Sequence, residues 1–344
     1  MPLRALPTPL EKPNMTQFSL RTAATALALL SSVALAATAA HAQIAYAIAS
    51  GGTTLISFNV ATPGTILSSA TINGNAALFP GGVPALDALA FRPSNGVLYG
   101  YDYNARSLFT VNTATGSLTS VGNAASASPN TNIVGMSFNP LIDRVRVVSD
   151  ATDNIVYDPS GGAAPNVATN LAYPSGNPAV DGPALVNANA YSNNVAGGFN
   201  STTQYGIDYQ AGTLVTIANN LGTLATVGSL GLGNAPSATT PALSAYTGLS
   251  IFTSLTGVNT AYALADTNVG GATPTFYNVN LATGAATNGQ VIGGGFTQVY
   301  GLAVTPLAAV VPEAGTLPLA LAALAVVVGA FGIARARTAT RHAA

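Results

Sequence analysis

Residues 108–122, LFTVNTATGSLTSVG, have the pattern of a β-hairpin, and this pattern decides the fold because it recurs along the chain. A strand of aromatic and β-branched residues leads to Asn112, and the following turn closes at Gly116. Asn and Thr side chains stabilise tight turns by hydrogen bonds to the backbone, and Gly supplies a positive φ. Four further copies occupy residues 55–72, 154–169, 213–228 and 275–292, with turn glycines at Gly64, Gly161, Gly222 and Gly284.

A second pattern, an apolar strand that ends near a proline or a turn, precedes every hairpin except the first. Its copies are residues 85–96, 133–143, 185–194 and 246–254. A fifth copy, VYGLAVTP at 299–306, has no hairpin after it, whereas residues 44–72 have the later strands without the first one. These complementary ends predict a ring in which the start and the end of the domain combine in one unit.

Each unit contains about four strands in roughly 45–60 residues, which is the size of a β-propeller blade. The expected units are residues 297–306 with 44–75, then 84–123, 131–170, 184–230 and 244–295. We therefore expect an all-β fold over residues 43–306, a β-propeller-like ring of four-stranded units closed by its N- and C-terminal strands. Five blades are favoured, and six are the alternative. A solenoid would not need the split unit, and a β-sandwich would not need five similar hairpins.

The same region resembles a bacterial domain-of-unknown-function family, the one numbered 4394. The similarity is carried by AYAIASGGTTLISFNVATPG (45–64), LAFRPSNGVLYG (89–100) and, above all, FNPLIDRVRVVSD (138–150). It extends over about residues 44–306. The resemblance implies a propeller-like fold and no particular reaction, because the family has no assigned activity.

Residues 1–42 have the features of a signal peptide. An apolar run, TAATALALLSSVALAATAA at 22–40, follows Arg21, and Ala40-His41-Ala42 matches the A-x-A cleavage pattern. This pattern predicts a mature chain that begins at Gln43. Met15 is an alternative start, and an uncleaved anchor is the alternative to cleavage.

The C-terminal region predicts a membrane anchor. Residues 317–333 carry no charge and would extend about 25 Å as a helix, close to the thickness of a hydrocarbon core. We assign residues 307–316 to a linker, 317–334 to a transmembrane helix and 335–344 to a basic tail, whose arginines favour the cytoplasmic side. The alternative is a buried helix, but such a helix normally has a polar face.

A Pro-Glu motif, a short apolar helix and a terminal Arg cluster together resemble a PEP-CTERM sorting signal over residues 311–341. The motif consists of Val311, Pro312, Glu313 and Ala314, and Ala314 stands where the family pattern has a second proline. The resemblance implies export by the Sec machinery and handling by an exosortase, a membrane-embedded transpeptidase. It also implies a Gram-negative bacterium that makes extracellular polysaccharide and biofilm.

Composition excludes several classes of function for residues 43–310, which contain nine Asp and four Arg but no Glu, Lys, Cys or His. Such a mildly acidic region lacks the basic patch that nucleic-acid binding requires. Without Cys and His it cannot form disulfides, thiolate or histidine metal sites, or the Ser-His-Asp and Cys-His catalytic arrangements.

Asp143, Arg144 and Arg146 form the first candidate site. Side chains alternate along a strand, so Arg144 and Arg146 are expected on one face. Guanidinium groups there could bind carboxylates or sugar hydroxyls. The alternative is a structural ion pair that links neighbouring blades.

Asp150, Asp153, Asn154 and Asp158 form the second candidate site. Their oxygen atoms are ligands that Ca²⁺ prefers, although the EF-hand glycine and glutamate are missing. A solvated turn is the alternative. We expect no cofactor other than this Ca²⁺.

Two further sets of residues are candidates for glycan chemistry. Glycoside hydrolysis needs two neighbouring acids, whereas Asp87, Asp102, Asp181, Asp208 and Asp266 are spread about one per unit. Tyr99, Tyr101 and Tyr103 alternate along one strand face, as either a sugar-stacking platform or a core stripe.

These patterns together predict a non-catalytic exported protein, anchored transiently in the inner membrane and then located in the cell envelope or outside the cell. Besides the exosortase and the Sec machinery, its expected partner is exopolysaccharide or another surface protein. The alternatives are an Asp-dependent hydrolase that acts on glycans and a structural coat protein with no defined ligand.

Overall fold

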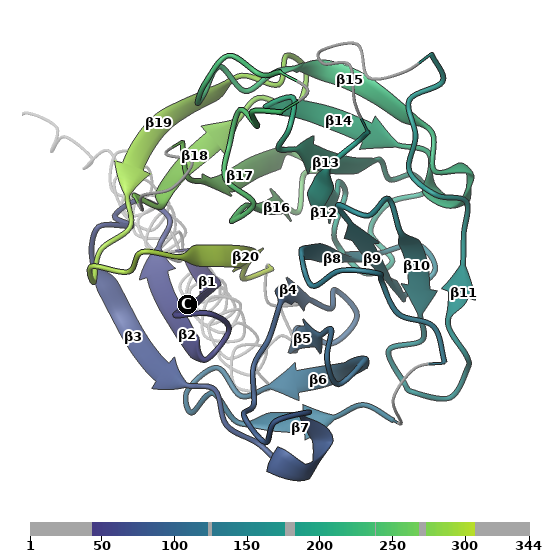
Figure 1. Ribbon diagram of the computed structural model, residues 1–344, viewed down its shortest axis with the longest axis vertical. Helices are drawn as coiled ribbons and strands as arrows, with labels where there is room; N and C mark the ends of the chain where they lie inside the picture. The colour runs from purple at the N-terminus through teal and green to yellow at the C-terminus, as the bar shows by residue number, and fades with distance from the viewer. Residues whose placement is uncertain (1–42, 123–125, 176–182, 238, 268–272, 307–344) are drawn as a thin grey trace, which may run out of the picture. The chain divides into compact units, whose positions relative to one another are not determined.

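The computed structural model describes residues 43–122, 126–175, 183–237, 239–267 and 273–306, and these form five four-stranded antiparallel sheets arranged as a ring (Figure 1). The first blade consists of β20 (Val299–Val304), β1 (Ile44–Ala49), β2 (Thr54–Asn59) and β3 (Ile66–Thr71). The second consists of β4 (Ala88–Phe91), β5 (Leu98–Asp102), β6 (Ser107–Val111) and β7 (Leu118–Ser120).

The remaining blades repeat this order from the inner to the outer strand. The third consists of β8 (Val134–Asn139), β9 (Arg144–Ser149), β10 (Asn154–Tyr157) and β11 (Asn166–Val167). The fourth consists of β12 (Val186–Tyr191), β13 (Gln204–Asp208), β14 (Thr213–Ile217) and β15 (Leu224–Ser229). The fifth consists of β16 (Gly248–Thr253), β17 (Asn259–Ala265), β18 (Thr275–Val279) and β19 (Ala286–Val291).

The first blade closes the ring by pairing the two ends of the propeller. β20 pairs with β1, so that Ala45 stands opposite Val304 and Tyr46 opposite Ala303. The amide of Thr305 also donates to the carbonyl oxygen of Ile44 at 2.8 Å. The five-bladed propeller and its closure by the terminal strands are therefore confirmed, and the six-blade, solenoid and sandwich alternatives are wrong.

Helical structure in the described part of the chain is limited to two 3-10 turns, η1 (Ala76–Leu78) and η2 (Asn219–Leu221). Within these residues no helix is long and apolar enough to span a membrane. The expected signal peptide with Ala40 and Ala42, the sorting motif at 311–314 and the expected transmembrane helix at 317–334 lie outside the described residues.

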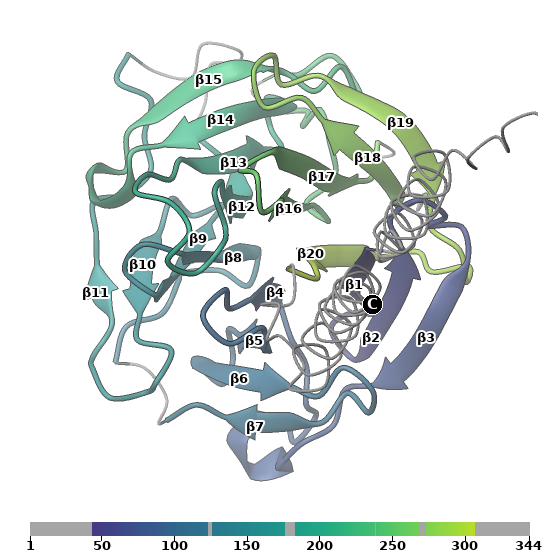
Figure 2. The same ribbon diagram turned by 180° about the vertical axis from the view of Figure 1, so that it is seen from behind.

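The inner strands β20, β4, β8, β12 and β16 surround the centre of the ring in both views (Figures 1 and 2). Among their side chains lie two small cavities of about 10 and 20 Å³, both lined by Leu89, Met136, Leu249 and Leu302 among others. Such a volume holds about one water molecule. The centre is therefore packed core and not an open ligand channel.

Aromatic side chains join neighbouring blades. The rings of Tyr46 and Phe91 connect the first two blades, with centroids 5.7 Å apart. Tyr99 and Phe138 connect the second and third blades at 5.1 Å. Both pairs are T-shaped, an arrangement that contributes about 0.5–1.5 kcal/mol beyond the burial of the rings.

The turn glycines have a second role that the hairpin pattern did not indicate, because their turns contact the outer edge of the preceding blade. A Cβ atom on Gly116 would collide with the carbonyl oxygen of Thr71, and one on Gly222 with the carbonyl oxygen of Asn170. Four of the five turn glycines have the expected positive φ. Gly64 does not have a positive φ, so the expectation was wrong for this glycine. A Cβ atom on Gly64 would lie 3.6 Å from its nearest neighbour, the carbonyl oxygen of Val291, so this turn is less crowded than the other four.

Candidate functional site

One position in the second strand of each blade carries a tyrosine in four blades and an arginine in the third. These residues are Tyr46, Tyr99, Arg146, Tyr205 and Tyr262, and each lies three residues before the end of its strand. They stand opposite Ala303, Ala90, Ser137, Ala190 and Ser250 of the adjacent inner strands. The shared register shows that Arg146 replaces the tyrosine of the repeat.

The replacement changes the contact between blades. Where Tyr46 and Tyr99 pack on phenylalanine rings, Arg146 reaches Tyr191 of the fourth blade and donates from Nε to its hydroxyl at 2.9 Å. The other hydrogen bonds of Arg146 go to Asn154 Oδ1 (2.5 Å), the carbonyl oxygen of Asn219 (3.2 Å) and Asn220 Oδ1 (2.7 Å). The arginine thus joins β10 of its own blade to the β14–β15 turn of the next.

The charge of Arg146 is buried without a counter-ion in the described part of the chain. The residue is 3% exposed, all its hydrogen-bond acceptors are neutral, and neither ion pair among the described residues includes it. Removing a guanidinium from water costs several kcal/mol, and neutral hydrogen bonds offset only part of this cost. A ligand with a negative charge next to the Arg146 guanidinium would offset the rest of this desolvation cost.

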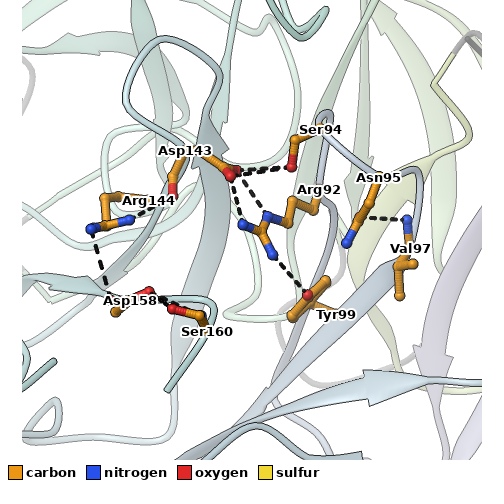
Figure 3. A network of polar contacts seen from close by, with 9 residues as sticks. All are labelled: Arg92, Ser94, Asn95, Val97, Tyr99, Asp143, Arg144, Asp158 and Ser160. Carbon is orange, nitrogen blue, oxygen red and sulfur yellow. Dashed lines mark hydrogen bonds and ion pairs between the residues drawn. The ribbon is translucent and has the colours of Figure 1, made fainter. Parts of the chain in front are cut away.

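Arg144 lies two residues earlier in β9, and both arginines line one cavity, which places them on one face. The side chain of Arg144 is 44% exposed, and its Nη2 lies 3.8 Å from Oδ2 of Asp158 (Figure 3). Its Nη1 donates to the carbonyl oxygen of Asp143 at 3.2 Å. No strong ion pair therefore holds Arg144, and its guanidinium can turn toward a ligand.

The Arg146 cavity, as we call the space between β9, β10 and the β14–β15 turn, has a volume of about 220 Å³. Its polar lining includes Arg144, Arg146, Asp158 and Asn220, and its apolar lining includes Ile142 and Val156. A second cavity of about 250 Å³ on the other side of the β10–β11 turn contains Arg106 and shares Asp158 with the first. The Arg146 cavity combines cationic donors, anionic and amide acceptors, and apolar walls.

Asp143 does not join the two arginines in this cavity. Its carboxylate accepts two hydrogen bonds from Arg92 of the second blade, from Nε at 2.9 Å and from Nη2 at 2.5 Å (Figure 3). Ser94 donates to the same carboxylate. Hydrogen bonds from Arg92 are the main cause of the lowered pKa of Asp143. Asp143 therefore forms an ion pair between blades, with a partner that the sequence analysis did not single out.

The four candidate calcium ligands have separate protein partners. Asp150 accepts from the Tyr209 hydroxyl, and Asp153 accepts from the amide and side chain of Asn130. Asn154 binds Arg146, and Asp158 binds Ser160. Within the part of the chain that the structure describes, no group of three acidic or histidine residues is arranged to hold a metal ion. The structure does not bring these candidates together as a calcium site.

Asp87 directly precedes β4, Asp102 is the last residue of β5, and the two carboxyl groups are close enough to interact electrostatically. Burial raises the pKa of Asp87 to about 7, although a hydrogen bond from the amide of Tyr103 opposes this, and the charge of Asp102 adds to it. Asp102 is 2% exposed and its carboxylate accepts from the amide of Ala105. Because Asp102 closes the β5–β6 turn inside the protein, a substrate cannot reach it as the second acid of a hydrolase.

The other described candidates for glycan chemistry, among them Asp208, Tyr99 and Tyr101, also have partners within the protein. Asp208 closes the β13–β14 turn by accepting from the amides of Gln210 and Ala211. Asp266 accepts from the amide of Thr273, and Asp181 lies outside the described residues. Tyr99 and Tyr101 are buried, and the Tyr101 hydroxyl lies 3.2 Å from that of Tyr157. These two tyrosines belong to the core and are not a platform for sugar stacking.

Comparison with known proteins identifies a family without a described activity. The family described as Domain of unknown function (DUF4394) matches residues 54–303. No curated protein matches the chain.

Three solved structures have low similarity to the chain. Hydrazine synthase of Kuenenia stuttgartiensis is 14% identical with a TM-score of 0.33, over 60% of this chain and 49% of that chain. A structural genomics protein of unknown function from Bacteroides thetaiotaomicron is 11% identical with a TM-score of 0.35, over 70% and 56% of the two chains. An auxiliary nutrient binding protein from the same organism is 13% identical with a TM-score of 0.35, over 62% and 42%. The chain spans about half the length of these structures.

Proposed function

The chain belongs to the family described as Domain of unknown function (DUF4394), and because that description assigns no activity, we propose a function from the Arg146 cavity. The protein is a non-catalytic, exported surface protein that binds acidic exopolysaccharide at this cavity. The observation that carries the proposal is the replacement of a repeated tyrosine by a buried arginine without a counter-ion among the described residues.

Burying the charged Arg146 side chain costs free energy that a tyrosine at the same position would not cost. A propeller that needed only an interblade contact at this position could use tyrosine, as β1 and β5 do. The arginine adds a desolvated charge and leaves one of its five N–H groups without an acceptor among the described residues. A planar donor of this kind suits a carboxylate or another oxyanion.

The cavity lining favours a saccharide over a bare inorganic anion. Asp158 and Asn220 offer acceptors and amide groups to hydroxyls, and Ile142 and Val156 provide apolar walls for the C–H face of a sugar ring. Binding pockets for small molecules commonly combine an apolar lining with a few convergent polar groups. The size of the cavity, about 220 Å³, suits one sugar residue of a longer chain.

Binding without catalysis follows from the groups that face the cavity. Residues 43–310 contain no histidine or cysteine, and Asp158 is the one acid that lines this space among the described residues. Glycoside hydrolysis normally uses two carboxyl groups about 5–10 Å apart on either side of the bond. The proposed role is therefore recognition.

Export and surface location are part of the proposal and are supported by sequence alone. The apolar segment and A-x-A pattern before Gln43 favour secretion through the Sec machinery. The segment 311–341 favours anchoring and exosortase handling. Mass spectrometry of the protein from its producing cells should find Gln43 at the N-terminus, and an intact residue 1 or 15 on the surface-located protein would contradict this part.

The binding test uses the full chain purified in detergent, with polygalacturonate and dextran sulfate as acidic probes and dextran as a neutral one. We expect binding to an acidic probe, weakened at least tenfold in both R146Q and R146Y. The variant D143N is the matched control, because Asp143 lies in a different ion pair. Equal binding by wild type and both Arg146 variants would overturn the proposal.

The same samples distinguish the alternatives. A hydrolase would release reducing ends from a polysaccharide and lose that activity on substitution of one aspartate. A structural coat protein would neither bind the acidic probes nor release sugar from them.

A further inference from the structure

We infer that the Arg146 cavity selects a hydroxylated monocarboxylate, such as a uronic-acid residue of a polysaccharide, and that Asp158 is the residue that sets this specificity. The inference rests on the proposed function and names the chemical class of its ligand. Asp158 is an acidic side chain in a cavity whose other charged residues, Arg144 and Arg146, are positive.

Asp158 follows β10 and lies across from Arg144, because Val156 pairs with Arg146 two residues earlier. Its Oδ1 accepts hydrogen bonds from the amide of Ser160 at 2.9 Å and from the Ser160 hydroxyl at 2.5 Å. Its Oδ2 lies 3.8 Å from Arg144 Nη2, which is too long for a hydrogen bond. The side chain is 12% exposed and lines both the Arg146 cavity and the neighbouring Arg106 cavity. Its Oδ2 accepts no hydrogen bond from the described residues, so this partly buried oxygen can accept one from a ligand.

The carboxylate of Asp158 is ionised at neutral pH. The hydrogen bonds from Ser160 and, to a smaller extent, the charge of Arg144 lower its pKa. Arg144 and Arg146 together with this carboxylate leave the cavity with one net positive charge. One carboxylate on a ligand balances this charge, whereas the dianion of a phosphate monoester exceeds it.

The unused oxygen of Asp158 distinguishes hydroxylated acids from simple ones. An acid without hydroxyls would place its negative charge near Asp158 Oδ2 with no donor for that oxygen. A sugar acid can direct its carboxylate to the guanidinium groups and donate a hydroxyl to Asp158. Hydrogen bonds to an ionised acceptor are about twice as strong as neutral ones, so the hydroxyl should contribute strongly to selection.

The experiment compares two carboxylates with rings of similar size, glucuronate and cyclohexanecarboxylate, by calorimetric titration of the full chain in detergent. We expect the wild type to bind glucuronate at least tenfold more tightly than cyclohexanecarboxylate. The isosteric variant D158N should reduce this ratio to near one and should bind inorganic phosphate several-fold more tightly than the wild type. D143N, an equivalent change outside the cavity, should keep the wild-type ratio.

A wild-type ratio near one would overturn the inference whether or not D158N folds, because that comparison needs no variant. An unchanged ratio in a folded D158N protein would also overturn it. Binding of dextran sulfate without binding of glucuronate or polygalacturonate would refute the uronic-acid assignment and leave the proposed function in place. Binding of no acidic saccharide would refute both.

Discussion

Arg146 of β9 and Tyr99 of β5 occupy the same position of their blades, opposite Ser137 and Ala90 of the inner strands. Tyr99 packs its ring against Phe138 of the next blade, and Arg146 donates a hydrogen bond to Tyr191 of the next blade. The two residues therefore join blades in the same place by different chemistry. The difference matters because only the arginine brings a charge to a cavity wall.

The first prediction concerns the stability of Arg146 variants. R146A should lower the free energy of unfolding by about 2–4 kcal/mol, since it leaves a void and an unsatisfied buried acceptor, Oδ1 of Asn154. R146Y should stay within about 1 kcal/mol of the wild type, because its ring can make a contact between blades like those of Tyr46 and Tyr99, and it removes a buried charge. Chemical denaturation of the three proteins measures their free energies of unfolding. If R146Y is no more stable than R146A, then Arg146 and Tyr99 do not occupy equivalent positions between blades.

The second prediction concerns the ion pair between Arg92 and Asp143. Asp143 is 37% exposed, so D143N should cost only about 0.5–1 kcal/mol at pH 7. The folded pKa of Asp143 is lowered by Arg92, so the stabilisation is present above the unfolded pKa of about 4 and is lost as the pH falls through the folded pKa. The melting temperatures of D143N and wild type should differ at pH 7 and converge once the pH falls below the folded pKa of Asp143. A difference that persists at low pH would mean that charge is not its cause.

The third prediction concerns Asp87. Its folded pKa of about 7 lies above the unfolded value of about 4, so ionisation favours the unfolded state as the pH rises between these values. Wild-type stability should therefore fall between pH 4 and 7 and level off above pH 7. D87N should remove this decline and be more stable by about 1–2 kcal/mol at pH 8. Chemical denaturation of both proteins from pH 5 to 8 gives the free energy of unfolding as a function of pH. If this free energy changes with pH in the same way in both proteins, the prediction is wrong.

The fourth prediction concerns the turn glycines. G116A should cost more than about 2 kcal/mol, because Gly116 combines a φ of 70° with close approach to Thr71 of the preceding blade. G64A is the matched change in the first blade and should cost less than about 0.5 kcal/mol, because its nearest neighbour is 3.6 Å away and its φ is not positive. Similar melting temperatures for the two variants would show that the blade contact at Gly116 is not close.

The fold could be predicted from short stretches because each blade repeats a local pattern. The residues 108–122 and 275–292 form equivalent hairpins, in which Asn112 and Asn280 accept from the amides of Ala114 and Ala282. Such bonds span a few residues and depend on the residue types alone. The split first blade was also predictable, because residues 299–306 supply the strand that residues 44–72 lack.

The candidate site was only partly predictable. The spacing of Arg144 and Arg146 indicates a shared face, but the sequence does not show which of the two is buried. Comparing the five strands in register would have revealed Arg146, because Tyr46, Tyr99, Tyr205 and Tyr262 occupy its position elsewhere. Arg92 was missed as the partner of Asp143, since these residues are 51 positions apart.

By itself the sequence determined the hairpins, the number of repeated units and the way in which the chain ends share a blade, because turn chemistry and strand alternation act over a few residues. The tertiary structure decided which side chains meet between blades. Arg146 reaches the carbonyl of Asn219, 73 positions away, only because the ring sets the fourth blade beside the third. A contact of this range depends on how whole sheets pack, so the buried charge and its cavity could be recognised only in the folded protein.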